Sequence, residues 1–245
     1  MKASIVIIAY NHQRWLADAI DSALAQKTNF KYEIVIGVDV SDDRTLDGAL
    51  QYAKFYDNIR VAYSSKRIGG KHNLSRSLAL AKGEYIALMD GDDFWNCKHK
   101  LQDQVSFLEK NKGYSASVTQ AEIEYHGYFD KRFESNYCRT QKDWHGDDVI
   151  TTPSFAANSS IVFKKDDVFP MPQWFFDMAW GDSALRGMLA SRGKFHYLQR
   201  KATTYRCNTW GALHKLREKG EAYMKKSSRQ ILENVAEYRQ KLLTT

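Results

Sequence analysis

The first 90 residues alternate between short apolar runs and stripes of apolar residues at helical spacing. Apolar runs of this length, rich in β-branched residues and followed by turn residues, are typical of buried strands. They predict strands at residues 4–10, 33–39, 59–63 and 84–89. The stripes predict helices at residues 15–24, 46–53 and 70–81. This order predicts an α/β fold: a doubly wound, mostly parallel sheet flanked by helices.

The rest of the chain predicts further elements and one long irregular stretch. Helices are predicted at residues 98–111 and 177–190, and strands at 114–125, 158–163 and 195–205. Residues 126–152 show no periodicity but contain five aromatic residues. A long connection is usually functional or disordered, and the aromatic content argues against plain disorder. We therefore expect a flexible lid or binding loop there.

The chain from residue 211 onward is predicted to be largely helical, and it is strongly basic. Apolar residues recur there at helical spacing, namely Ile231, Leu232, Val235, Tyr238 and Leu242. Such a stripe most often packs on its own domain or on a partner, and binding to a membrane surface is the less favoured alternative. We expect one domain at residues 1–210 and a basic amphipathic helical extension at 211–245.

Composition bounds the class of protein. The chain has 245 residues, enough to bury a full core, and 43% of them are hydrophobic. No run of about 18 apolar residues occurs, so no transmembrane helix is expected, and the first ten residues are too short for a signal peptide. The scattered cysteines at 97, 138 and 207 favour a reducing, cytoplasmic location. The net charge of +7 suggests nucleotide phosphates, an anionic membrane surface or nucleic acid as a partner.

An acidic cluster follows the predicted strand at 84–89. It consists of Asp90, Asp92 and Asp93. In parallel sheets ligands collect beyond the carboxyl ends of the strands. Clustered carboxylates repel one another, and Mg²⁺ or Mn²⁺ relieves this repulsion by bridging carboxylates to substrate phosphates. A solvated acidic turn is the alternative, and the position directly after a core strand makes it the less favoured one.

Two further acids are predicted at element ends, Asp39 after the second strand and Asp182 at the start of a later helix. Strand ends converge in a doubly wound sheet. One acid could therefore bind a nucleobase or a ribose hydroxyl, the acidic cluster could bind a metal ion, and the third acid could accept a proton. This combination suits displacement at a carbon that carries a diphosphate leaving group. Glycine-rich phosphate loops are absent from the sequence, so the diphosphate would depend on the metal and on Lys71 or Arg67. Each acid could instead only cap a turn or a helix.

Five segments in the right order resemble the family 2 glycosyltransferases of the GT-A fold, the bacterial kind that builds surface polysaccharides. The matching segments are residues 4–11, 33–43, 82–95, 100–105 and 180–185. They cover most of residues 1–112 and, more thinly, 155–206. The resemblance implies a nucleotide-binding half at 1–112 and an acceptor-binding half at 113–210, with a mobile loop at 126–152.

The resemblance also implies an inverting transfer of a sugar from a nucleotide-sugar, usually UDP-linked, with Mn²⁺ or Mg²⁺ as cofactor. Asp182 would be the catalytic base, and Asp92 would bind the metal, with Asp90 as a second candidate ligand. The residues expected to bind the nucleotide-sugar are Tyr10, Asp39, Lys71, Asp90, Gly91, Trp95 and Trp180. Tyr10 and Asp39 would contact the uracil, and the two tryptophans would line the sugar sites.

The sequence departs from the family pattern in two places. The second strand of the family often ends in two acids, whereas here Val38 precedes Asp39. The family often carries Tyr-Arg-x-His near the end of the domain, whereas here the fourth position is Asn208. His214 is a candidate replacement for that histidine, although the spacing alone does not support it.

The expected acceptor is a glycan or a lipid-linked glycan of the cell surface, including lipopolysaccharide. The basic surface and the C-terminal helix are expected to hold the protein peripherally at the cytoplasmic face of the inner membrane, with no nucleic-acid partner and an open oligomeric state. Two alternatives stay open. A nucleotidyltransferase usually needs a glycine-rich loop after the first strand, which residues 9–12 do not resemble. A non-catalytic module that binds nucleotide-sugars is disfavoured by the Asp-x-Asp pair and the candidate base.

Overall fold

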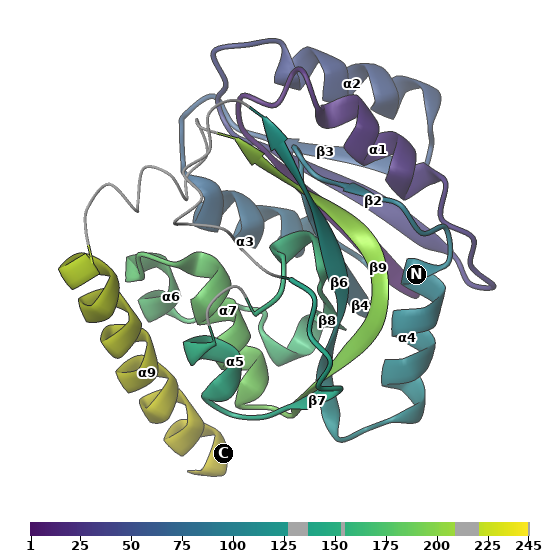
Figure 1. Cartoon of the computed structure of the whole chain (residues 1–245). Coiled ribbons are helices and arrows are strands. Elements are labelled where there is room, and N and C mark those ends of the chain that lie inside the picture. The colour runs from purple at the N-terminus through teal and green to yellow at the C-terminus, as the bar shows by residue number, and fades with distance from the viewer. Residues whose placement is uncertain (127–136, 153–154, 209–220, 245) are drawn as a thin grey trace.

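The computed structural model describes residues 1–126, 137–152, 155–208 and 221–244. Within these residues nine strands form one sheet in the order β3-β2-β1-β4-β8-β6-β9-β5, and β7 pairs with β9 (Figure 1). The strands are β1 (Ala3–Ala9), β2 (Tyr32–Val38), β3 (Ile59–Tyr63), β4 (Tyr85–Asp90), β5 (Phe94–Trp95), β6 (Tyr114–His126), β7 (Asp143–Trp144), β8 (Val162–Lys164) and β9 (Lys194–Asn208). The longer helices are α1 (Leu16–Leu24), α2 (Thr45–Phe55), α3 (Gly70–Leu80), α4 (Lys100–Lys110), α7 (Gly181–Ala190) and α9 (Glu221–Thr244). The short ones are α5 (Asp148–Thr151), α6 (Gln173–Asp177), η2 (Asn158–Ser160) and η3 (Lys165–Asp167).

Strands β3, β2, β1 and β4 are parallel, and helices cover both of their faces. Alternate residues of β1 enter different cores: Ile5 and Ile7 belong to the core that includes residues of α1, α2 and α4, and Val6 belongs to the core that includes residues of α3, α5, α7 and α9. The side chains of a strand point alternately to the two faces of the sheet, so a strand that is apolar throughout must be covered on both. The predicted doubly wound fold is confirmed, with β8, β5 and β7 as antiparallel additions.

The second half of the sheet differs in detail from the sequence prediction. Residues 158–160 form the 3₁₀ turn η2, and only 162–164 form the strand β8. The two-residue strand β5 was not expected, and β9 extends to Asn208. β9 runs parallel to β6 over its whole length and also pairs with β5. These pairings join segments that are roughly 80 and 110 residues apart along the chain, so local periodicity does not encode them.

Part of the expected flexible loop at 126–152 forms short elements in the described structure, and its mobility stays a prediction. Residues 137–152 include β7 and α5, and Tyr137, Val149 and Ile150 are buried. Val149 and Ile150 belong to the larger core beside α7 and α9. The segment is packed although its sequence lacks periodicity. The reason is that its core contacts come from single apolar residues and not from a regular apolar stripe. Residues 127–136 of the predicted loop lie outside the described residues.

Helix α9 packs on the domain through its apolar stripe. Ile231 and Val235 are fully buried against α5 and α7. Gly187 permits this close approach, because a Cβ atom there would lie 2.4 Å from Cγ2 of Val235. The stripe is therefore used by the domain itself. Among the described helices, none combines the length and the apolar character needed to cross a bilayer.

Glu33 joins three parts of the sheet at the amino end of β2. Its carboxylate accepts hydrogen bonds from Ser4 Oγ at 2.7 Å, from the backbone N–H of Lys82 at 2.6 Å, and from Arg60. Burial alone would raise the pKa of Glu33, but these hydrogen bonds outweigh burial and lower it.

We expect Glu33→Gln to lower the free energy of unfolding by about 2–3 kcal/mol at pH 7, because the partly buried Arg60 loses a charged acceptor. The lowered pKa makes the contribution of Glu33 fully present above the pKa of the unfolded state, and it is lost as the pH falls through the folded-state pKa. Urea unfolding at pH 7 and at pH 3 measures both. Equal destabilisation at the two pH values would contradict this role.

Candidate functional site

The carboxyl ends of β1, β2 and β4 bring the predicted acids to one edge of the sheet. The registers place Ile8 beside Asp90 and Ala9 beside Val38. The backbone N–H groups of Gly91 and Asp39 then donate to the carbonyls of Ile8 and Ala9. Residues that follow three parallel strands therefore share one edge, as the sequence predicted.

Asp90 lies at the centre of this edge. Asn158 Nδ2 donates to its two carboxylate oxygens at 3.3 and 3.4 Å, and its own backbone N–H donates to Ser159 Oγ at 2.9 Å. Burial, followed by the charges of Asp92 and Asp182, raises the pKa of Asp90 to about 7. Asp182, on α7, is thus one of the charges that act on Asp90. The site combines carboxyl groups from two segments that are distant along the chain.

Asp92 faces His12 across the site. Nε2 of His12 lies 3.7 Å from Oδ2 of Asp92, and the two side chains are only 20% and 17% exposed. His12 was missed by the sequence interpretation. Its position three residues after the end of β1, at the same sheet edge, is the signal that could have identified it.

Asp93 points into the protein. It is fully buried, Ser159 Oγ donates to one carboxylate oxygen, and the backbone N–H of Arg206 donates to the other at 2.9 Å. Burial, and then the charges of Asp92 and Asp90, raises the pKa of Asp93 well above its ordinary range. The acidic cluster therefore divides into two residues that face the site and one that anchors the turn.

Arg206 is a second residue that the sequence interpretation did not place in the site. Its guanidinium lies 4.6 Å from the ring centroids of both Trp15 and Phe94, and it pairs with Asp18 at 2.7 Å. One of its nitrogens also donates to the backbone carbonyl of Asp92 at 3.4 Å. Arg206 thus connects β9 to the turn that carries the acids.

Asp39 and Tyr10 lie beside the loop before α3. Asp39 is buried and accepts hydrogen bonds from the backbone N–H groups of Ile68 at 2.9 Å and Gly69 at 2.7 Å. The guanidinium of Arg67 lies 4.2 Å from the ring centroid of Tyr10. Asp39 therefore shapes the loop that brings Arg67 over Tyr10, whatever else it binds.

Asp182 lies in the first turn of α7, with its side chain 41% exposed and 3.2 Å from Nη1 of Arg186. The segment before it is attached to α3 by Lys71, whose ammonium donates to the backbone carbonyls of Phe176 and Met178. Burial lowers the pKa of Lys71. The structure brings Lys71 to the segment that carries Asp182, where sequence reasoning expected it at a diphosphate.

The two predicted tryptophans differ in their surroundings. Trp180 is partly buried and caps α7 next to Asp182. Trp95 is 4% exposed, its indole N–H donates to the carbonyl of Ser159 at 2.7 Å, and Lys100 Nζ lies 4.0 Å from its ring centroid. The expectation that Trp95 lines a sugar site is corrected, because its ring packs in the core and its indole N–H binds the backbone of Ser159.

Two residues bear on the predicted departure from the family pattern. Asn208 is the last residue of β9 and is opposite His126 in the sheet. His214 lies outside the described residues, so its candidate role stays a prediction.

The side chains at this edge suit a divalent cation that also binds a phosphate group of the substrate. In the described part of the chain, no group of three or more His, Cys, Asp or Glu side chains is arranged to hold a metal by itself. Mg²⁺ and similar ions are commonly held by one or two carboxylates, with substrate phosphates and water as the other ligands. Burial, and then the charge of Asp92, raises the pKa of Asp90, and a cation at this edge would offset the repulsion between the two carboxylates.

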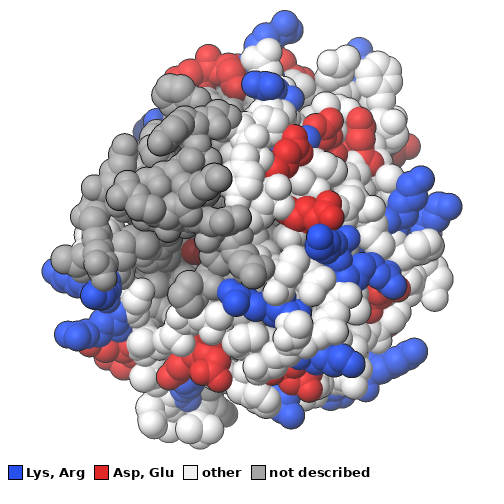
Figure 2. Space-filling view, viewed as in Figure 1, with Lys and Arg blue, Asp and Glu red and all other residues white. Residues whose placement is uncertain are grey.

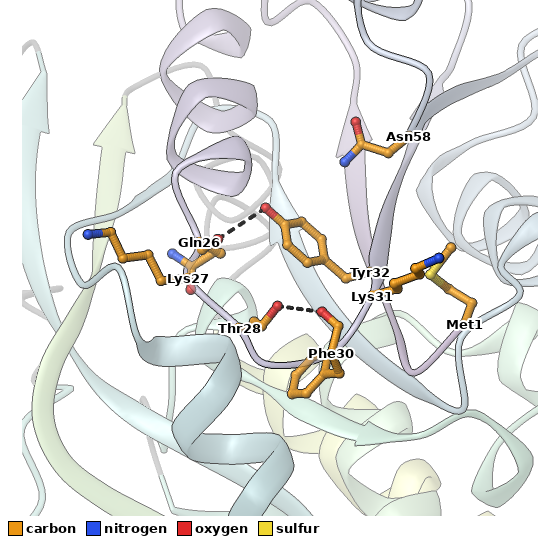
Figure 3. A pocket seen from close by; sticks show the side chains of 8 residues that line it. All are labelled: Met1, Gln26, Lys27, Thr28, Phe30, Lys31, Tyr32 and Asn58. Carbon is orange, nitrogen blue, oxygen red and sulfur yellow. Dashed lines mark hydrogen bonds between the residues drawn. The ribbon is translucent and has the colours of Figure 1, made fainter.

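A hollow elsewhere on the molecule is separate from this site. Figure 3 shows that it lies around the α1–β2 connection, and its lining consists of Met1, Gln26, Lys27, Thr28, Phe30, Lys31, Tyr32 and Asn58. These residues precede β1, β2 and β3 or, in the case of Tyr32, begin β2, so the hollow is at the amino edge of the sheet. The acidic residues are at the opposite, carboxyl edge.

Comparison with known proteins gives a family match and several relatives. Residues 4–168 match the family model described as glycosyl transferase family 2. An uncharacterised protein of Mycobacterium tuberculosis is 28% identical over 217 residues, covering 86% of this chain and 60% of that protein. The Escherichia coli protein WfaP, named a UDP-Glc:α-D-GlcNAc-diphosphoundecaprenol β-1,3-glucosyltransferase, is 34% identical over 140 residues, covering 55% of this chain and 53% of that protein. This chain thus spans at most about 60% of the length of these curated relatives.

Two solved structures share the fold. Staphylococcus aureus TarS in complex with UDP superposes with a TM-score of 0.63 at 17% identity, covering 85% of this chain and 61% of the TarS chain. The mannosyltransferase PcManGT of Pyrobaculum calidifontis, solved with GDP-Man and Mn²⁺, superposes with a TM-score of 0.63 at 15% identity, covering 96% of this chain and 73% of that chain. At these identities the likeness concerns the fold, which agrees with the predicted GT-A architecture.

Proposed function

The chain belongs to glycosyl transferase family 2, and on this premise we propose that it is an inverting, metal-dependent glycosyltransferase. It moves a sugar from a nucleoside-diphosphate sugar to a hydroxyl group of a glycan or lipid-linked acceptor. The observation that carries this proposal is that Asp39, Asp90 and Asp92 follow paired strands at the carboxyl edge of the sheet, where the charge of Asp182 also acts on the pKa of Asp90. A base and a metal-binding carboxylate at one edge are what displacement of a diphosphate requires.

Asp182 is the catalytic base in this proposal. Its partly exposed carboxylate accepts the proton of the acceptor hydroxyl while that oxygen bonds to the anomeric carbon. The bond from this carbon to the diphosphate oxygen breaks, and its electron pair leaves with the diphosphate. Attack from the face opposite the leaving group inverts the configuration. Arg186, one helical turn later, helps to keep the carboxylate oriented.

Asp92 is the proposed metal ligand, with Asp90 as a second candidate. A bound divalent cation would neutralise the charge that develops on the leaving diphosphate. Support for such an ion comes from the charge concentration at Asp90 and from the structural neighbour PcManGT, which was solved with GDP-Man and Mn²⁺. The turn 90–93 holds the acids rigidly, because Asp93 and Arg206 fix its inner side.

The donor is proposed to be a UDP-sugar bound over the first half of the chain. Tyr10 with Arg67 above it, and Asp39 beside them, form the proposed base-binding corner. A fold neighbour of this chain, TarS, was solved with UDP, which supports this choice. Gly91 of the acidic turn is proposed to lie against the donor, and Trp180, at the start of α7, is proposed to line the sugar site.

A polysaccharide or lipid-linked acceptor is proposed because a relative, WfaP, is named for a diphosphoundecaprenol substrate. Such an acceptor would place the protein at the cytoplasmic face of a membrane, with its basic residues toward anionic lipid. Figure 2 shows acidic and basic side chains interspersed on the visible face, where a nucleic-acid-binding protein would be expected to gather its basic ones.

A nucleotidyltransferase is the competing function, and the loop after β1 argues against it. The backbone N–H groups of Asn11, His12 and Gln13 donate to side chains of the 41–45 segment at 3.1, 2.8 and 2.9 Å. A phosphate-gripping loop must present such groups to the ligand. Here they are already occupied.

Calorimetric titration with UDP, GDP and CDP, each with and without Mn²⁺, tests the proposed function. We expect UDP to bind with the highest affinity and only in the presence of the metal. Failure of all three nucleotides to bind under either condition would contradict the proposal and favour a protein without a nucleotide-sugar donor.

We expect Lys71→Met to lower kcat about 10–100-fold and to leave the Kd for the nucleotide within about twofold. The reason is that the ammonium holds the backbone of Phe176 and Met178, and a small displacement of the base has a large kinetic cost. Steady-state kinetics at saturating donor, together with calorimetry, measure the two effects. Lys66→Met, at an exposed lysine of the preceding loop, is the control.

The original expectation for Lys71, a contact with the diphosphate, predicts the reverse result. In that case the Kd for the nucleotide would rise tenfold or more. Lys71→Arg separates the two roles further, since a guanidinium keeps the charge but does not reproduce the geometry of the two carbonyl contacts.

A further inference from the structure

His12 has a fixed position in the site. Its backbone N–H donates to Thr45 Oγ1 at 2.8 Å, and its carbonyl accepts from the N–H groups of Trp15 and Leu16, both at 2.9 Å. The backbone at His12 is therefore held by two helix starts, those of α1 and α2. This leaves the imidazole ring directed at the turn that holds Asp92.

The separation between the two side chains suits a shared cation. Nε2 of His12 and Oδ2 of Asp92 are 3.7 Å apart, which is longer than a hydrogen bond. Two ligands of one ion with bonds of about 2.1 Å lie roughly 3.0 Å apart when adjacent and about 4.2 Å apart when opposite. The observed distance falls between these limits, and both side chains are mostly buried.

The surroundings of the ring argue against a purely structural histidine. Nδ1 of His12 is buried and has no hydrogen-bond partner among the described residues. Gly91 makes room for this ring, because a Cβ atom at position 91 would lie 2.8 Å from Nδ1. The backbone of Gly91 does not have a positive φ, so an alanine there would be excluded by the imidazole and its neighbours rather than by backbone strain. Gly91 of the Asp-Gly-Asp turn thus leaves the space that the ring of His12 occupies.

We propose that His12 is a second protein ligand of the divalent cation, beside Asp92, and that it makes the site prefer Mn²⁺ over Mg²⁺. This inference rests on the proposed metal-dependent function. A neutral imidazole nitrogen is a softer ligand than a carboxylate or water oxygen, and Mg²⁺ favours sets made of oxygen ligands. Mn²⁺ accepts a nitrogen ligand more readily, so the histidine selects between the two ions.

The test uses bound Mn²⁺ itself as the reporter, on the full chain. Mn²⁺ is titrated alone and with UDP, GDP or CDP, and the free ion is measured by electron paramagnetic resonance. Pulsed measurements on the bound ion then detect coupling to an imidazole nitrogen. We expect this coupling in the unmodified protein. We expect His12→Gln to abolish it and to weaken Mn²⁺ binding about tenfold or more, with Mg²⁺ binding changed less than about twofold.

Two further variants sharpen the result. His12→Asp supplies an oxygen ligand, so it should restore binding while removing the preference for Mn²⁺. His99→Gln, at an exposed histidine before α4, is the matched control and should change neither property. Thermal unfolding of each variant verifies that it is folded, and the coupling measured on the unmodified protein decides the question even if a variant does not fold.

The outcomes separate this inference from the proposed function. Bound Mn²⁺ without nitrogen coupling, or with an affinity that His12→Gln does not change, overturns the role of His12 and leaves the metal-dependent function intact. If the unmodified protein binds no Mn²⁺ with any of the three nucleotides, both proposals are overturned.

Discussion

Replacing Asp182 by Asn is expected to lower kcat by about 10³-fold and to leave the affinity for the donor nucleotide unchanged. General base catalysis contributes roughly 10²–10⁴-fold, and an amide of the same shape cannot accept the proton of the acceptor hydroxyl. The carboxylate lies in the first turn of α7, on a different element from Tyr10 and Asp39 of the proposed base-binding corner. Its loss should therefore affect chemistry and not nucleotide binding.

The measurement pairs transfer kinetics at saturating donor with calorimetry of the nucleotide. Asp166→Asn, at an exposed acid on η3, is the matched control and should be without effect. Normal turnover in Asp182→Asn would refute the assignment of the base. It would leave the acidic pair on β4 as the site of a different reaction or of binding alone.

Replacing Asp92 by Asn is expected to remove the metal dependence of nucleotide binding and to lower kcat/KM by about 10²-fold or more. The carboxylate is the proposed ligand of the ion that neutralises the leaving diphosphate. Its charge also contributes, after burial, to the raised pKa of Asp90. Removing that charge should lower the pKa of Asp90 from about 7 toward its ordinary value, although burial remains.

Two independent readouts check this prediction. Calorimetry with and without Mn²⁺ measures the metal dependence, and carbon NMR of the aspartate carboxyl groups follows the titration of Asp90. Asp57→Asn, at an exposed acid between α2 and β3, is the control. Nucleotide binding that still requires Mn²⁺ in Asp92→Asn would show that another group holds the ion. An unchanged titration of Asp90 would contradict the electrostatic part of the prediction.

The proposed sites of nucleotide binding, metal binding and proton transfer lie in three different regions of the fold, so variants can affect them separately. The donor corner follows β1 and β2, the acidic turn follows β4, and the base lies on α7. Lys71 joins the first region to the third by its contacts with the carbonyls before α7. Arg206 joins the acidic turn to β9. A variant at a joining residue should therefore act on geometry, whereas a variant at an acid acts on charge.

The hydrophobic pattern alone predicts much of the first half of the chain. Strands such as β1 and β4 are apolar on both faces, and this property is local, so it can be read from consecutive residues. Parallel strands place their carboxyl ends at one edge, so the sequence also predicts that Asp39 and Asp90 lie at the same edge, where they flank the end of β1.

Only the tertiary structure decided what each side chain at that edge does. Asp92 and Asp93 are adjacent in sequence, yet Asp93 is turned inward because Ser159 and Arg206, which are remote along the chain, hold it. Trp95 is buried for a related reason, since its indole N–H donates a hydrogen bond to the carbonyl of Ser159. His12 meets Asp92 because β1 and β4 are paired. Periodicity records which positions are buried, but the partner of a buried polar group comes from a distant segment, and only the packed chain brings the two together.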